Sequence, residues 1–440
     1  MKKFVLPIVA LIYFSTITMA QAPKINFEKY TLPNGLKVIL HRDNSAPVVA
    51  VTALYHVGSK NEDTGRTGFA HFFEHLLFEG SDNIKRGEFD KYVTSAGGAL
   101  NANTSQDRTF YYELLPSNQL KLGLWLESER MMHAKIEEIG VKTQREVVKE
   151  EKRQRVDNQP YGSILDQTFK RAFRVHPYKW MPIGSMEHLN KAQLQEFIDF
   201  YKKYYVPNNC VLSIAGDFNL DSAKKNIALY FKDIPKGTVA INRPNIVEPP
   251  LNGEVRDIIE DNVQLPLLLQ AYRTPKQGTE DYYTFSVLST ILSGGESSRM
   301  QKILVNKSQQ ALAAAAFPFA LEDAGLFIVY SLPNMGNSVE KLEKSMDSII
   351  TELKENLVPE KEYQKVMNQI QSNFVQKNSS MAGIAESLAN YEVYFNDANL
   401  INNEIDRFKK VTRQDIQRVA KKYLNKDNRV VLTYVPKKKG

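Results

Sequence analysis

The sequence predicts an α+β protein with two similar halves, each a mostly antiparallel sheet with helices packed on one face. Three observations predict this fold class. Short β-branched and aromatic runs are mixed with longer segments of helical periodicity in a chain of 440 residues. A helix–turn–strand segment occurs once in each half, and a proline-rich passage separates the two copies.

The elements of the first half follow one another in mixed order. Strands are expected at residues 36–40, 48–56, 109–115 and 211–216, and helices at residues 69–78, 120–133, 142–156 and 191–204. Two sheets that each bury one face against helices are the natural packing solution for such a mixture.

The recurring segment indicates a duplication. Residues 202–212 and 421–431 both contain the end of a Lys-Lys-Tyr helix, a turn with Asn and a β-branched strand. The matched residues Asn209 and Asn428 lie 219 positions apart (428 − 209). We interpret the two copies as a duplicated domain. Chance similarity between two helix–turn–strand units is the alternative.

Composition divides the chain further. Residues 236–253 are rich in proline and read as a linker between an N-terminal domain at residues 21–235 and a C-terminal domain at residues 254–440. All seven histidines lie in the first domain. A metal bound by histidine must therefore be held there.

Residues 1–20 have the pattern of a secretory signal peptide. Lys2-Lys3 precedes an apolar stretch, and small residues precede a cleavage site after Ala20. We expect export to the periplasm or the medium, with no stable membrane span after cleavage. An uncleaved anchor is the alternative, although the apolar run is short for a span. Cys210 is the only cysteine, so no intrachain disulfide is possible.

The charge pattern excludes one class of partner. The formal net charge is +7, which is mild for a chain of this size. No basic stripe with interleaved aromatic residues is present, so nucleic-acid binding is not expected.

The strongest chemical signal is the stretch His71-Phe72-Phe73-Glu74-His75. On a helix the two histidines and the glutamate share one face, because residues three and four apart are neighbours. Two imidazoles one turn apart can bind zinc, and the glutamate can accept a proton from water that the metal activates. The apolar residues form a separate stripe: Phe69, Phe72, Phe73, Leu76 and Leu77. Ordinary helix-surface residues are the alternative.

A catalytic zinc site needs a third protein ligand. The helix expected at residues 142–156 offers the adjacent acids Glu150 and Glu151. Glu151 shares a partly apolar face with Val148, whereas Glu150 lies on a charged face. A carboxylate on a buried face needs a positive partner, which zinc would provide. We therefore predict one zinc ion per chain, bound by His71, His75 and Glu151.

Glu74 is the predicted catalytic residue of a zinc metalloendopeptidase. It would accept a proton from the attacking water and pass it to the leaving amine. The alternative is that Glu74 only orients a histidine ligand. A serine or cysteine hydrolase is disfavoured, because the sequence has no G-x-S-x-G motif and Cys210 lies in an apolar strand.

With these motifs the chain resembles the pitrilysin/insulinase group of zinc peptidases, which includes the mitochondrial processing peptidases. The resemblance covers nearly all of the chain after the leader, and Glu151 follows His75 by 76 residues (151 − 75). It implies a bacterial exported peptidase whose two similar halves close like a clamshell around a peptide. Further matching motifs are Leu32-Pro33-Asn34-Gly35-Leu36, residues 97–104 and residues 293–299.

The segment at residues 97–104 resembles the strand that pairs with substrate in this family. Glycine permits close approach of two backbones, and an exposed edge strand can add a peptide as a further strand. We expect Asn101, Ala102 and Thr104 to contact the substrate. A glycine-rich hairpin corner without a ligand is the alternative.

Two departures from the family pattern concern the rest of the site. Gln144 stands where members often carry another acid, and Val305 and Ala314 stand where many carry an arginine and a tyrosine that hold the substrate carbonyl. We therefore predict the zinc-bearing subunit of a hetero-oligomeric peptidase with a homologous partner chain; a homodimer is the other arrangement. The alternative function is a non-catalytic or weakly active polypeptide-binding subunit that keeps the zinc site.

Overall fold

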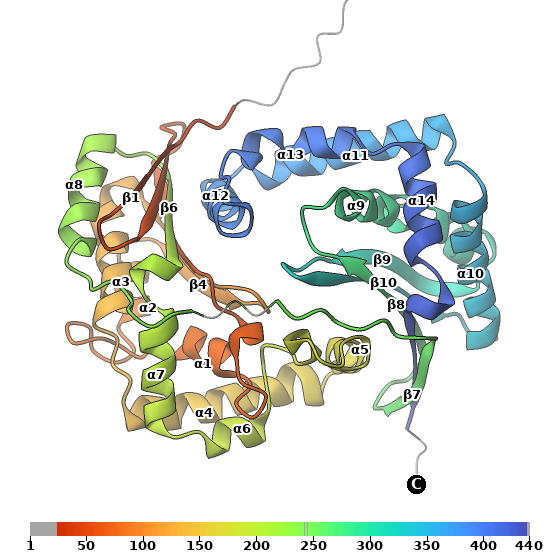
Figure 1. Ribbon diagram of the computed structural model, residues 1–440, viewed down its shortest axis with the longest axis horizontal. Helices are drawn as coiled ribbons and strands as arrows, with labels where there is room; N and C mark the ends of the chain where they lie inside the picture. The colour runs from red at the N-terminus through yellow and green to blue at the C-terminus, as the bar shows by residue number, and fades with distance from the viewer. Residues whose placement is uncertain (1–23, 242, 244, 438–440) are drawn as a thin grey trace, which may run out of the picture.

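The structure is a computed structural model that describes residues 24–241, 243 and 245–437. The predicted signal peptide at residues 1–20 lies outside these residues. Figure 1 shows two sheets, one from each half of the chain, surrounded by helices. Within the described ranges, no helix is both long and apolar enough to cross a bilayer.

The first sheet has six strands in the order β1-β2-β6-β3-β5-β4, so β4 lies at an edge. The β2–β6 pair is parallel, and the other neighbouring pairs are antiparallel. The bounds are β1 Glu28–Thr31, β2 Lys37–Arg42, β3 Val48–Tyr55, β4 Ala99–Thr104, β5 Thr109–Pro116 and β6 Cys210–Gly216.

The second sheet has five strands in the order β7-β11-β8-β10-β9, with one parallel pair, β7–β11. Both sheets are therefore mixed: most of their strand pairs are antiparallel, in agreement with the prediction, and each contains one parallel pair that the sequence does not predict. Strand composition does not report pairing direction, because the connections decide it. The bounds are β7 Val255–Asp261, β8 Leu267–Pro275, β9 Ala311–Phe319, β10 Ala324–Pro333 and β11 Arg429–Pro436.

The helices of the first half are α1 Phe69–Leu76, α2 Phe89–Ser95, α3 Leu120–Met132, α4 Glu138–Lys152, α5 Ile164–Ala172, α6 Met186–Lys191, α7 Leu194–Tyr204 and α8 Leu220–Phe231. Those of the second half are α9 Glu280–Ser293, α10 Val339–Glu355, α11 Glu360–Lys377, α12 Met381–Phe395, α13 Leu400–Lys409 and α14 Arg413–Tyr423. The helix expected at residues 191–204 is divided, because the backbone at Ala192 and Gln193 is extended.

The two halves share one strand order. If β2, β6, β3, β5 and β4 are replaced by β7, β11, β8, β10 and β9, the first sheet without β1 becomes the second. α7 and β6 begin at Leu194 and Cys210, and α14 and β11 begin at Arg413 and Arg429, which is the 219-residue offset of the sequence repeat.

One helix from each half crosses to the other sheet. The α12 residues Ile384 and Leu388 pack against the first sheet, and Phe169 of α5 packs against the second. Both faces of each sheet are therefore covered, whereas the prediction placed helices on one face only. Helices cover both faces because the central strand β6 is apolar on both sides: every one of its residues is buried, so neither side of the strand is exposed to solvent.

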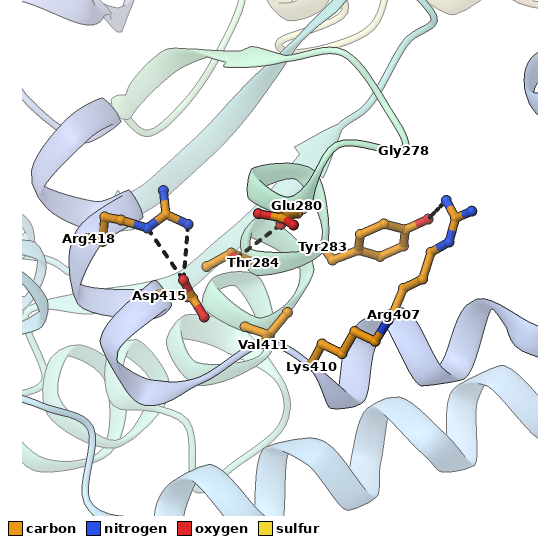
Figure 2. Close-up of a pocket in the computed structure, with 9 residues that line it drawn as sticks. All are labelled: Gly278, Glu280, Tyr283, Thr284, Arg407, Lys410, Val411, Asp415 and Arg418. Atoms are coloured by element: carbon orange, nitrogen blue, oxygen red, sulfur yellow. Dashed lines mark hydrogen bonds and ion pairs between the residues drawn. The ribbon is translucent and has the colours of Figure 1, made fainter.

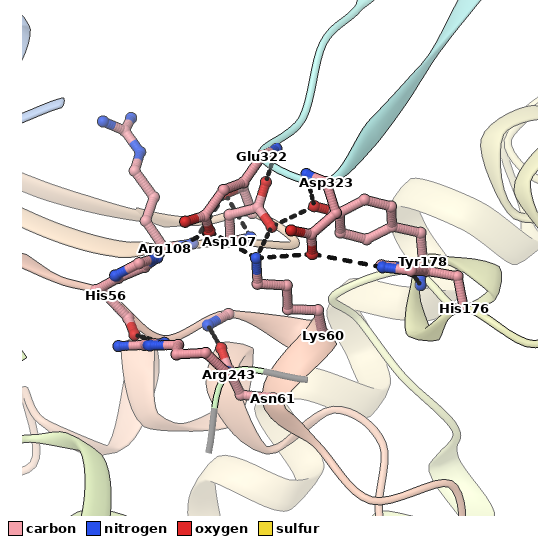
Figure 3. Close-up of polar contacts among 12 residues, drawn as sticks. His56, Lys60, Asn61, Asp107, Arg108, His176, Tyr178, Arg243, Glu322 and Asp323 are labelled. Carbon is pink, nitrogen blue, oxygen red and sulfur yellow. Dashed lines mark hydrogen bonds and ion pairs between the residues drawn. The ribbon is translucent and has the colours of Figure 1, made fainter. Parts of the chain in front are cut away.

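A buried charged cluster joins the halves at the turns of their edge hairpins. Lys60, whose side chain is only 6% exposed, lies 3.0 Å from Asp107 in the β4–β5 turn. The same ammonium group lies 2.5 Å from Glu322 and 3.1 Å from Asp323 in the β9–β10 turn. Figure 3 shows the carboxylates of both turns converging on this lysine. We call these four residues the Lys60 cluster.

Candidate metal centre

The site is built on α1, a helix of eight residues that follows a sharp backbone turn at Gly68. Gly68 has a φ of +99°, a left-handed conformation in which glycine carries no steric penalty. The apolar stripe predicted from the sequence lies in the first core, where Phe69, Phe72 and Phe73 are buried. This packing turns the opposite side of α1 toward α4 and β4.

Three ligand atoms converge beside α1. His75 Nε2 lies 3.3 Å from His71 Nε2 and 3.0 Å from Glu151 Oε2, and His71 Nε2 lies 3.5 Å from the same carboxylate oxygen. Among the described residues, these three form the one group of histidine, cysteine or acidic side chains close enough to share a metal ion.

The spacing of these atoms fits zinc. Zinc–nitrogen bonds of about 2.0–2.1 Å place neighbouring ligand atoms of a tetrahedron about 3.3 Å apart. Glu151 Oε2 is buried, and no described residue donates a hydrogen bond to it with acceptable geometry. Its lone pairs and those of the two imidazoles are therefore directed at a common centre, which a cation would satisfy.

Electrostatics favour ligation by neutral histidine. Burial and then the neighbouring His75 lower the pKa of His71 to about 4, so its imidazole is neutral and can donate a lone pair at neutral pH. Burial acts to raise the pKa of Glu151, but the close approach of His75 and the positive charge of Arg155 lower it below its usual value. Glu151 is therefore ionised, as a carboxylate ligand must be.

The helix face of α4 decides which acid reaches the histidines. The Glu151 side chain is 14% exposed, whereas the neighbouring Glu150 is 52% exposed and pairs with Arg153 at 3.1 Å. Val148, one turn before Glu151, is buried. The structure thus brings Glu151, and not Glu150, to His71 and His75.

Arg155 is a site residue that the sequence prediction missed. Its guanidinium lies 2.6 Å from Glu151 Oε1, the oxygen that does not face the histidines. Arg155 therefore pairs with the second oxygen of the carboxylate, while its own side chain is 78% exposed. Its position four residues after Glu151, on a continuing helical turn, is the signal that could have identified it.

Glu74 lies on the same face of α1 and contacts β4. Thr104 donates a hydrogen bond to Glu74 Oε2 at 2.6 Å, so the predicted substrate contact Thr104 is engaged by the candidate base. Burial raises the pKa of Glu74, and the Thr104 hydrogen bond and His75 partly oppose that rise. A carboxylate with a raised pKa is a stronger general base at neutral pH.

The edge strand β4 lies beside this group. Asn101 and Ala102 line an open pocket of about 330 Å³ together with Glu74 and His75. Ala102 N–H donates to the Asn101 side chain at 2.9 Å, within its own strand. Gln144 lines the same pocket and donates to Glu79 at 2.5 Å.

The second half contributes none of the converging ligand atoms. Val305 and Ala314 are partly buried and pack against the second core. Figure 2 shows another cavity of about 370 Å³, lined by residues between Gly278 and Arg418. All of its lining residues belong to the second half, so this cavity is separate from the metal group.

Comparisons with known proteins agree with this arrangement. Residues 37–181 match the family described as insulinase (peptidase family M16), and residues 191–370 match the peptidase M16 inactive domain. The zinc protease PqqE of Helicobacter pylori is 32% identical over 418 residues, which cover 94% of each chain. The chain therefore belongs to the peptidase M16 (insulinase) family.

Two further proteins are similar along most of the chain. The crystal structure of a protease from Helicobacter pylori superposes with a TM-score of 0.89 at 31% identity, covering 94% of this chain and 100% of that one. A probable mitochondrial-processing peptidase subunit beta of Arabidopsis thaliana is 24% identical, covering 90% of this chain and 75% of that one.

Proposed function

We propose that this protein is a zinc-dependent endopeptidase that hydrolyses peptides or unfolded polypeptide segments. The observation that carries the proposal is the convergence of His71, His75 and Glu151 beside the partly buried carboxyl group of Glu74. Zinc would supply Lewis acidity there when bound by these three ligands. Membership of a family with named zinc proteases supports the same chemistry.

The protein's own residues account for the proton transfers. Glu74 accepts a proton from the attacking water and later delivers it to the leaving amine, as its raised pKa favours. Thr104 holds one oxygen of this carboxylate in place. Arg155 pairs with the oxygen of Glu151 that does not face the histidines.

Substrate is proposed to bind as an added strand on β4. Among the described residues, no strand pairs with the outer edge of β4, and Asn101 and Ala102 line the pocket that contains Glu74. An extended peptide would displace the Asn101 side chain from Ala102 N–H and pair with the backbone. Thr104 contributes by its contact with Glu74.

The proposal is tested by Glu74→Gln. We expect zinc content to stay at the wild-type level and peptide cleavage to fall by about 10²- to 10⁴-fold, because the base is lost and the ligands remain. Zinc content is measured by atomic emission, and cleavage with an unstructured fluorogenic peptide. Glu150→Gln, next to Glu151 but solvent-facing, should change neither. Unchanged cleavage by Glu74→Gln would remove this residue from the mechanism.

We propose further that the chain is the zinc-bearing subunit of a hetero-oligomer, because Val305 and Ala314 offer no hydrogen-bond donor to a substrate carbonyl. A homodimer is the other arrangement. Cleavage should rise when a homologous chain encoded nearby is added. Full activity of the chain alone would contradict this, and peptide binding without cleavage in both cases would favour a non-catalytic binding subunit.

We also propose export, with cleavage after Ala20, and two duplicated domains, residues 21–235 and 254–440, that are joined by a linker at residues 236–253 and close like a clamshell around a peptide. The shared strand order supports the duplication. N-terminal sequencing of protein recovered from the periplasm or the medium should begin at Gln21. An N-terminus at Met1 in a membrane fraction would contradict cleavage.

A further inference from the structure

The helix that carries both histidines is short. α1 has eight residues, and isolated helices shorter than about 12–15 residues are marginal in water. Its first residue is preceded by Gly68, which has no side chain to cap it, whereas α9, α10 and α12 begin with a local Thr or Ser cap. Its free backbone groups need partners from elsewhere in the chain.

The buried carboxyl group of Glu62 binds the N-terminal end of α1. Glu62 Oε2 accepts the N–H of Gly68 at 2.9 Å, and Glu62 Oε1 accepts the N–H of Ala70 at 2.8 Å. Both oxygens of Glu62 are thus used on the first turn, and the side chain is almost fully buried. Burial raises the pKa of Glu62 to about 8, so the two backbone hydrogen bonds, and not a full negative charge, hold this end of the helix at neutral pH.

A buried guanidinium binds the C-terminal end. Arg130 Nη1 of α3 donates to the carbonyl oxygen of Leu77, the C-cap residue of α1, at 3.0 Å. A positive charge at a helix C-terminus complements the helix dipole. Tyr111 of β5 supports the same turn, since its hydroxyl donates to Phe73 O at 2.9 Å.

Arg130 is itself held rigidly. Its Nε donates to Glu127 at 3.0 Å, and its Nη2 lies 3.4 Å from Glu113. Burial and then the nearby Glu127 raise the pKa of Glu113 well above its usual range, so Glu113 keeps its proton at neutral pH. Three aromatic rings, those of Phe78, Phe89 and Tyr111, lie 4.2–5.0 Å from the guanidinium carbon.

From these contacts we infer that Glu62 and Arg130 are positioning residues that hold α1 at its two ends and so set the 3.3 Å separation of the two histidine Nε2 atoms. Ligand groups must be held within about 0.5 Å of the productive geometry. The inference rests on the proposed zinc site. Neither residue touches the ligand atoms, so each acts through α1.

The test compares zinc affinity, measured by competition with a chromogenic chelator, in wild type, Glu62→Gln and Arg130→Lys. Removing groups that orient ligands typically weakens metal binding by about 10- to 100-fold, and we expect that range for Glu62→Gln. Arg130→Lys keeps one charged donor, so its zinc affinity should lie between those of Glu62→Gln and wild type. KM should stay constant, and saturating zinc should restore kcat, because the substrate strand is unchanged.

Two matched controls separate positioning from general stability. Glu248 also accepts backbone N–H groups, at Arg174, Val175 and His176, but away from α1. Arg429 is a buried arginine with carboxylate partners in the second half. Glu248→Gln and Arg429→Lys should lower the thermal midpoint without weakening zinc binding.

The outcomes distinguish the inference from the proposed function. Wild-type zinc affinity in Glu62→Gln, or an equal loss in the two controls, would overturn positioning while leaving zinc catalysis intact. A wild-type chain that binds no zinc would overturn both. If Arg130→Lys does not fold, the zinc affinity of Glu62→Gln alone tests the inference. Glu62→Gln is expected to fold, because among the described residues Glu62 does not pair with a buried charged side chain.

Discussion

In each half, an equivalent helix position faces the edge strand of the sheet, but the side chain at that position differs between the halves. At the 219-residue offset, Ser293 of α9 corresponds to Glu74 of α1. Ser293 accepts the N–H of Ala316 in β9 and donates to its carbonyl, both at 2.9 Å. Glu74 instead accepts from the Thr104 side chain and not from the backbone of β4.

This difference shows how one topology yields a site in only one half. In the second half the helix serines occupy the backbone of the edge strand at Ala316. In the first half the same helix face carries His71, Glu74 and His75, and the proposed peptide site lies on β4. The asymmetry thus depends on a few side chains and not on the strand order.

The largest difference between the halves is expected when a predicted zinc ligand and its counterpart in the other half are each replaced by alanine. His71→Ala should abolish zinc binding and lower kcat/KM by at least about 10³-fold, because the site loses one of three protein ligands. Thr290→Ala, at the equivalent position in α9, should leave both at the wild-type level. Metal analysis and peptide cleavage check this. Zinc retained by His71→Ala would place the metal elsewhere.

The crossing helices predict that the halves unfold together. Phe169→Ala in α5 should lower the free energy of unfolding by about 3–5 kcal/mol, and Leu388→Ala in α12 by about 2–5 kcal/mol. Both tryptophans, Trp125 and Trp180, lie in the first half. Phe169 lies against the second sheet, yet its loss should shift the tryptophan fluorescence transition and the circular dichroism transition equally. Two separated transitions would show that the halves are independent.

The Lys60 cluster tests how strongly the contact between the two halves contributes to stability. Lys60→Met leaves three carboxylates together without their shared cation, and we expect a loss of about 3–5 kcal/mol in urea unfolding. Lys191→Met, which removes an exposed pair with Glu187, should change stability by less than about 0.5 kcal/mol. Equal effects of the two substitutions would mean that the cluster does not join the halves.

The smallest expected effect is on pH dependence. The Thr104 hydrogen bond lowers the pKa of Glu74, so Thr104→Val should raise it and move the acidic limb of the kcat/KM profile to higher pH. Activity is then lost at mildly acidic pH and retained at higher pH. Ser293→Ala, at the matched helix position, should leave the profile in place. An unchanged acidic limb in Thr104→Val would mean that another group controls it.

Much of this arrangement follows from sequence patterns. The helical stripe of Phe69, Phe72 and Phe73 faces the core, and the 219-residue repeat agrees with the bounds of α7–β6 and α14–β11. The helix-face argument applied to Glu150 and Glu151 rests on the same periodicity. Local patterns of this kind persist in the fold because they describe which side of an element is apolar.

The remaining features depend on long-range packing. The apolar face of α12 is visible in the sequence, but nothing local indicates that it covers the sheet of the other half. Glu62 and Arg130 are buried ionisable residues, but nothing in the sequence around them distinguishes them from ionisable residues at the surface. The break between α6 and α7 did have a local signal, since Gln193 and Glu196 form a capping box.

The crossing of α12 also concerns the order in which the chain is made. The first sheet is complete at Gly216, but the helix that covers its outer face ends at Phe395, 179 residues later (395 − 216). At about 5–20 residues per second, synthesis of this interval takes roughly 10–35 s. During that time Leu54, Phe110 and Val211 have no covering helix. The nascent first half thus exposes an apolar sheet face until the second half has been synthesised.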